Sequence, residues 1–180
     1  MFDNIGLTPA PSGPALMVED LGNPSLPGSS ALTGSTYTFT GSGNLGDGGH
    51  FRFQQFSGDV VVTARILSLT GSGIFPPAKG GVMIRDVSLD AAPYGMMSIG
   101  SFWGGYFMWR NVVGASFGAN YSGSNAVPQW IRIVREGDTI TAWKAVNTTA
   151  NTPGPWIQQG ATQVFSAGAP IYVGLAADTG

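Results

Sequence analysis

Hydrophobic and polar residues alternate along much of the chain, most clearly over residues 130–143. Two runs rich in β-branched and aromatic residues there flank Gly137 and Asp138, which are typical of a tight hairpin turn. Because successive side chains of a strand point to opposite faces, the pattern predicts an antiparallel pair with one buried face. In this hairpin, Ile133 faces Ala142, Arg135 faces Ile140 and Arg132 faces Trp143; Ile131, Ile133, Ile140 and Ala142 share the apolar face, and Arg132, Glu136, Thr141 and Trp143 share the more polar one.

Similar short runs recur along the rest of the chain, separated by clusters of turn-forming residues. Many short strands at this spacing predict an all-β fold, a two-sheet antiparallel sandwich of the jelly-roll type. The other predicted strands cover residues 36–40, 51–53, 60–69, 81–85, 94–99, 106–110 and 171–176, and turn clusters lie at 41–44, 46–49, 71–73 and 152–155.

Length and charge narrow the range of functions. A chain of 180 residues can form one all-β domain with a substantial core. Its 8 basic and 10 acidic residues form no charge runs, which argues against nucleic acid or an anionic membrane as a partner. The chain contains no cysteine, so stability must come from packing rather than disulfides.

Four segments resemble a known family in sequence and in order. They are residues 51–66, with Phe56-Ser-Gly-Asp59 leading into Val62-Thr-Ala-Arg65, and residues 78–85, 130–135 and 172–176. This set resembles the concanavalin A-like or laminin G-like sandwich modules of bacterial secreted proteins, of the regulation-of-enolase type. The likeness covers residues 18–177. It implies an extracellular or cell-surface module without catalytic activity of its own.

The two ends depart from that family. Its members close with a short strand resembling Ala-x-Phe-Asp-Asn-Val, which is missing after residue 176, whereas residues 1–7 look like that strand. We therefore divide the chain into a displaced closing strand at 1–7, a proline-rich linker at 8–17 and a sandwich domain at 18–180. The strand belongs to a neighbouring subunit's sandwich, belongs to the preceding copy in a tandem repeat, or folds back into its own sheet.

The first two alternatives predict a subunit or repeat of a cell-surface fibre or array that assembles head to tail with copies of itself. In that interpretation the strand is received beside residues 171–176, because the family's closing strand follows that one. The predicted assembly strand comprises Phe2, Asp3, Asn4, Ile5 and Leu7, and the predicted acceptor edge comprises Ile171, Val173 and Leu175.

Candidate catalytic and metal-binding groups are sparse, and we expect no enzymatic activity and no cofactor. The two glutamates, Glu19 and Glu136, have no carboxylate partner at the spacing that glycoside hydrolysis needs. His50 is the sole histidine, which rules out a histidine cluster; a Ser-His-Asp set could use it, but no Gly-x-Ser-x-Gly motif accompanies it. Calcium is a weaker possibility at the loop containing Asp47, or at Asp86 with Asp90, although these residue types also simply form turns.

Glycan binding is the alternative function. Sugars stack on exposed aromatic rings beside a few polar groups. The densest aromatic stretch spans residues 102–109, and we take Trp103, Tyr106 and Trp156 as candidate glycan-binding rings. Core packing or subunit contact is the competing role for these rings. Trp143 is expected to stack on Arg132 across the hairpin.

Overall fold

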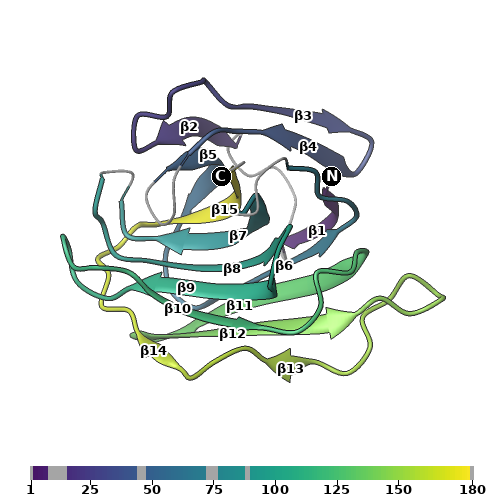
Figure 1. Ribbon diagram of the computed structural model, residues 1–180. Helices are drawn as coiled ribbons and strands as arrows, with labels where there is room; N and C mark the ends of the chain where they lie inside the picture. Colours follow the sequence, from purple (N-terminus) through teal and green to yellow (C-terminus); the bar gives the residue numbers. More distant parts are fainter. Residues whose placement is uncertain (1, 8–15, 44–47, 72–76, 88–89, 179–180) are drawn as a thin grey trace.

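The structure, a computed structural model, describes residues 16–43, 48–71, 77–87 and 90–178 in full and the backbone alone of residues 2–7. Every regular element among these residues is a β-strand, and all strand pairs are antiparallel (Figure 1). The described part contains no helix long and apolar enough to cross a membrane. The all-β, two-sheet antiparallel prediction is confirmed.

The first sheet has eight strands among the described residues. In spatial order they are β13 (Ile157–Gln158), β12 (Thr139–Val146), β11 (Gln129–Glu136), β6 (Val60–Ile66), β1 (Phe2–Leu7), β4 (Thr36–Thr40) and β3 (Ser29–Thr33), with β14 (Gln163–Val164) also paired to β12.

The second sheet has seven strands in the same part of the chain. Their spatial order is β10 (Gly118–Ser122), β9 (Gly104–Arg110), β8 (Tyr94–Gly100), β7 (Lys79–Arg85), β15 (Ile171–Asp178), β5 (Gly49–Phe56) and β2 (Met17–Leu21).

The hairpin of β11 and β12 has the register that its sequence predicts. Ile133 pairs with Ala142, and the strands are joined by Gly137 and Asp138. The predicted apolar face is buried, whereas Glu136 is exposed. The sequence does not indicate strands β2, β3, β10, β13 and β14, because these strands are short and show no sustained alternation of hydrophobic and polar residues.

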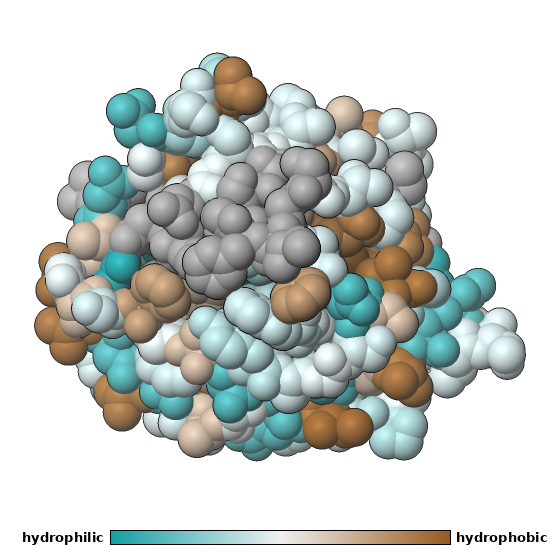
Figure 2. Space-filling view, in the orientation of Figure 1, coloured by the Kyte–Doolittle hydropathy of each residue, from teal (hydrophilic) through white to brown (hydrophobic). Residues whose placement is uncertain are grey.

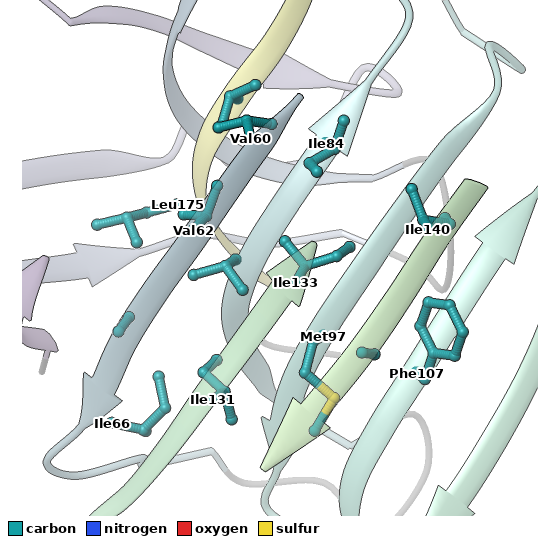
Figure 3. Packing of buried hydrophobic residues seen from close by; sticks show 14 of the residues in the cluster. Val60, Val62, Ile66, Ile84, Met97, Phe107, Ile131, Ile133, Ile140 and Leu175 are labelled. Atoms are coloured by element: carbon teal, nitrogen blue, oxygen red, sulfur yellow. The ribbon is translucent and has the colours of Figure 1, made fainter. Parts of the chain in front are cut away.

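The main core lies between the two sheets (Figure 3). Apolar side chains of β6, β11 and β12 meet those of β7, β8, β9 and β15. Figure 3 shows Ile131 and Ile133 of β11 among Met97, Ile84 and Phe107 from the second sheet. Because one face of each sheet contributes, this layer defines a sandwich.

The second sheet is also buried on its other face. A separate cluster there includes Phe51, Phe53, Tyr94, Met96 and Met108, and the rings of Phe51 and Phe53 stack 4.7 Å apart. Every residue of β7 and β8 is consequently buried. Burial on two faces explains why these strands are apolar or glycine-rich throughout instead of alternating.

Strand β1 lies inside the first sheet of its own chain, between β6 and β4. Phe2 pairs with Ile66 on one side and Tyr37 on the other, and an irregularity between Asp3 and Gly6 shifts the register against β6. The side chains of this strand, including those of Asn4, Ile5 and Leu7, lie outside the described residues.

The predicted acceptor edge at Ile171, Val173 and Leu175 is wrong. Strand β15 is paired along both sides, with β5 and with β7, so it has no open edge to receive another strand. The position that β1 occupies is in the opposite sheet. The predicted linker falls largely on residues 8–15, which lie outside the described part.

Candidate functional site

The loop between β8 and β9 holds a tryptophan in a conformation that hairpins usually give to glycine. Gly100 pairs with Gly104, which leaves Ser101, Phe102 and Trp103 as a three-residue loop. Trp103 has a φ of 62°. Three-residue hairpin loops place a left-handed residue where glycine is favoured. A larger residue in this conformation costs about 1–2 kcal/mol, and such strain is concentrated at functional sites.

Trp103 belongs to a group of exposed aromatic rings, which we call the aromatic platform: Phe102, Trp103 and Tyr121. Their exposed fractions are 40%, 47% and 45%. The Trp103 ring lies 5.2 Å from the Phe102 ring and 5.8 Å from the Tyr121 ring, measured between centroids. Tyr121 is supported from below by an edge-to-face contact with the buried ring of Tyr106, at 4.9 Å.

Beside the platform is an open hollow lined by Trp103, Tyr121, Ser122 and Gly123. The Lys144 ammonium donates to the backbone oxygen of Ser122 at 2.6 Å and to its hydroxyl at 2.9 Å. That hydroxyl in turn donates to Gln159 at 2.7 Å. Burial lowers the pKa of Lys144 from its usual value. The hollow therefore combines apolar ring faces with a hydroxyl fixed by two partners.

A close backbone approach holds the two sides of the hollow together. A Cβ on Gly104 would lie 2.5 Å from the carbonyl oxygen of Gly123 and 2.6 Å from that of Ser124. Only glycine allows the end of β10 to lie this close to the start of β9. The Asn125 side chain adds a hydrogen bond to the Ser101 carbonyl at 2.8 Å. The platform is thus built on a tightly packed pair of turns.

Of the three predicted glycan-binding rings, only Trp103 has an open position. Tyr106 is 1% exposed, and its hydroxyl donates to the Phe102 carbonyl, so its assignment as a binding ring is wrong. Burial, followed by the charges of Tyr121 and Asp178, raises the pKa of Tyr106 to about 12. Tyr121 and Ser122 were missed because their strand lacks an alternating pattern; the register that sets Tyr121 opposite Tyr106 brings them to the site.

Trp156 lies elsewhere, against the outer face of the first sheet. The Arg132 guanidinium lies 4.0 Å from the centroid of its ring, so this face is partly covered. The predicted partner of Arg132 was Trp143, whose indole instead donates to Thr141 at 2.9 Å. Arg132 and Trp143 do pair in the hairpin register, but the guanidinium contacts Trp156.

Of the calcium candidates, Asp47 lies outside the described residues. Asp86 accepts a hydrogen bond from the Gly168 amide at 3.1 Å, and Asp90 accepts one from the Gly22 amide at 3.2 Å. No group of three or more His, Cys, Asp or Glu side chains suited to a metal occurs in the part of the chain described.

His50 has partners that its sequence context did not reveal. Its Nδ1 lies 2.7 Å from Asp20 Oδ1, and its Nε2 lies 3.1 Å from Ser30 Oγ. Arg52 donates to the same Ser30 hydroxyl at 3.3 Å. Asp20 faces His50 directly across β2 and β5, whereas Ser30 comes from β3 of the other sheet. A Ser-His-Asp set therefore exists without the motif that usually signals it.

No family model matches the chain, and no curated protein matches its sequence.

Proposed function

We propose that this protein is an extracellular carbohydrate-binding module that uses the aromatic platform of Phe102, Trp103 and Tyr121. The observation that supports this proposal best is the exposed indole of Trp103, held at a left-handed loop position. Strain of this kind persists where the surrounding structure enforces it, and a binding surface is a common reason for it.

The chemistry of the hollow suits a pyranose sugar. Such rings have an apolar face of C–H groups that stacks on aromatic side chains, and hydroxyl groups around the rim. The Ser122 hydroxyl and the backbone oxygens near Gly123 are polar groups beside the rings. The three rings of the platform carry no charge and suit the neutral C–H face of a sugar, and the Lys144 ammonium lies beside them on Ser122.

A polysaccharide pull-down with insoluble glucans, xylan and chitin, followed by a glycan array, tests the proposal. We expect the wild-type protein to be retained on at least one neutral polysaccharide, and the Trp103→Ala and Tyr121→Ala variants to be lost from it. Val113→Ala is a matched control, because Val113 is also an exposed apolar side chain, at 67%, and does not belong to the platform. Retention of Trp103→Ala at the wild-type level would exclude the platform as the binding surface.

Self-assembly by strand exchange is a second candidate, supported by the position of β1. This strand contributes a central position of the first sheet, between β6 and β4, although the next strand along the chain, β2, belongs to the second sheet. The same position can be filled by β1 of a neighbouring copy, in the manner of strand complementation. Figure 2 shows hydrophobic side chains interspersed among polar ones on one face of the protein. In this second candidate, backbone pairing of β1 with β6 and β4 of the neighbouring copy holds the assembly together.

Electron microscopy and sedimentation of the purified protein test this second candidate. Strand exchange predicts filaments or closed oligomers that disappear when residues 1–7 are deleted. A single monomeric species at all concentrations would rule it out and leave carbohydrate binding unaffected.

A further inference from the structure

The strands β2, β3 and β5 bring together three side chains that form a nucleophilic relay in hydrolases. Asp20 lies 2.7 Å from one nitrogen of His50, and Ser30 lies 3.1 Å from the other. We propose that Ser30, His50 and Asp20 form a site that hydrolyses carboxylic esters. This proposal is independent of carbohydrate binding and runs against our expectation, from sequence alone, of no catalysis.

The hydrogen bonds of Asp20 fix its orientation. Both carboxylate oxygens accept from the Gly28 amide, at 3.2 and 3.0 Å, and one of them also contacts His50 Nδ1. A carboxylate acts only as an acceptor, so Nδ1 carries the proton and donates it to Asp20. Nε2 is then the acceptor in neutral histidine, and the Ser30 hydroxyl donates to it. This is the protonation pattern that a general base needs.

The imidazole is held tightly. His50 is 3% exposed, and a Cβ on Gly28 would lie 2.5 Å from its ring atoms, so only glycine fits against it. The Phe39 ring packs edge-on against the imidazole at 5.9 Å. The rotamer that directs Nε2 toward Ser30 is therefore enforced by packing on more than one side.

Ser30 is reachable by a substrate, whereas its base is sheltered. It lies on β3, the edge strand of the first sheet, and its side chain is partly exposed. The Arg52 guanidinium, 3.3 Å from Ser30 Oγ, contributes a positive charge beside the hydroxyl. A positive charge beside the attacking oxygen stabilises the negative charge that develops there as the serine proton is removed.

The reaction uses only these groups and water. Ser30 Oγ bonds to the ester carbonyl carbon while His50 Nε2 takes the serine proton. The carbon–oxygen bond to the alcohol then breaks, and the alcohol leaves with that proton. Water, activated by His50, cleaves the acyl-serine, releasing the acid and restoring the hydroxyl. The substrate class is therefore a carboxylic ester whose carbonyl carbon can reach Ser30 at this sheet edge.

Covalent labelling with a fluorophosphonate tests whether Ser30 is nucleophilic. We expect one adduct per chain by intact mass, mapped to Ser30 by peptide sequencing. Ser29→Ala is the matched control, because the adjacent Ser29 is exposed and its hydroxyl contacts Thr40 instead. Ser29→Ala should be labelled like the wild type, and Ser30→Ala should not. The absence of an adduct on Ser30 in folded protein would overturn the proposal.

Hydrolysis of p-nitrophenyl acetate provides the kinetic test. His50→Gln should lower kcat by about 10²-fold or more, because it removes the general base. Asp20→Asn acts through the histidine, so it should lower kcat and leave KM unchanged. If Asp20 has only a structural role, kcat will not fall independently of KM. Thermal unfolding of Ser30→Ala and Ser29→Ala checks that both remain folded. Equal hydrolysis rates for wild type and Ser30→Ala would show that the three residues only tie the two sheets together.

Discussion

Replacing Trp103 by glycine or by alanine separates the strain of the β8–β9 loop from the function of the ring. Both substitutions remove the indole and its contacts with Phe102 and Tyr121. They differ only in the Cβ atom, which is strained at the observed φ of 62°. Glycine tolerates that conformation without strain, and alanine does not.

The magnitude follows from two opposing effects. The left-handed conformation costs a non-glycine residue about 1–2 kcal/mol. Glycine in place of alanine also lowers the free energy of unfolding by about 0.4–1 kcal/mol, because it gives the unfolded chain more conformational entropy. We therefore expect Trp103→Gly to exceed Trp103→Ala in unfolding free energy by about 0.8 kcal/mol. For a chain of this length that is a Tm difference of roughly 2 °C.

Urea unfolding and calorimetry of the two variants measure this difference. Val113→Gly and Val113→Ala form the control pair, because Val113 is exposed and has no positive φ. There the order should reverse, with alanine the more stable by about 0.4–1 kcal/mol. Both Trp103 variants should lose polysaccharide binding to the same extent. If Trp103→Gly is no more stable than Trp103→Ala, the reasoning about loop strain is refuted.

Three further predictions concern the buried groups. Lys79 and Asp178 form an ion pair at 2.8 Å with exposures of 1% and 6%, so Lys79→Met should lower the unfolding free energy by about 3–5 kcal/mol. In urea titrations the double variant Lys79→Met/Asp178→Leu should recover most of the lost unfolding free energy, because no buried charge is left unpaired. Equal losses in the single and double variants would contradict this explanation. The pKa of Tyr106 in the folded protein, about 12, exceeds the ordinary value of 10.0. The folding stability that protonated Tyr106 contributes is therefore present below pH 10 and is lost as the pH rises toward 12. Unfolding free energies across that range should fall more steeply for the wild type than for Tyr106→Phe, and parallel curves would refute the assignment. A Cβ on Gly95 would lie 2.2 Å from Ile140 Cδ1, so Gly95→Ala should destabilise by about 1–3 kcal/mol. Gly95→Ala/Ile140→Val removes the clashing atom and should be the more stable variant by thermal unfolding; if it is not, overpacking is not the cause.

The sequence predicts the fold where one face of a strand is buried. The hairpin of β11 and β12 is such a case, because its alternation sets both register and burial. Alternation does not reveal β3, whose residues are mostly exposed and which is held by its pairing with β4. Alternation is also misleading for Tyr106 and Phe107. These two side chains point to opposite faces and are both buried, because the second sheet is covered on both sides.

In the candidate sites, too, the sequence indicates some residues locally, whereas others are brought in only by the tertiary fold. Trp103 is recognisable because it precedes two glycines in an aromatic stretch. Tyr121 joins it only through the pairing of β10 with β9, which no local pattern indicates. Asp20 and Ser30 reach His50 from different sheets, at separations of 30 and 20 residues, so their meeting depends on the tertiary fold. For the same reason the sequence predicts an acceptor edge at residues 171–176, whereas β1 lies between β6 and β4, since the order of strands in a sheet is not encoded locally.

The most direct test of carbohydrate binding at the platform is a nitrogen-15 NMR titration that follows the indole signals of the five tryptophans. The ligand is a soluble hexasaccharide of the polysaccharide that retains the protein in the pull-down. Binding at the platform predicts that the Trp103 signal shifts, while the signals of buried Trp130 and of Trp156, which contacts Arg132, stay in place. A shift confined to Trp156, or no shift of Trp103 at saturating ligand, would contradict the account.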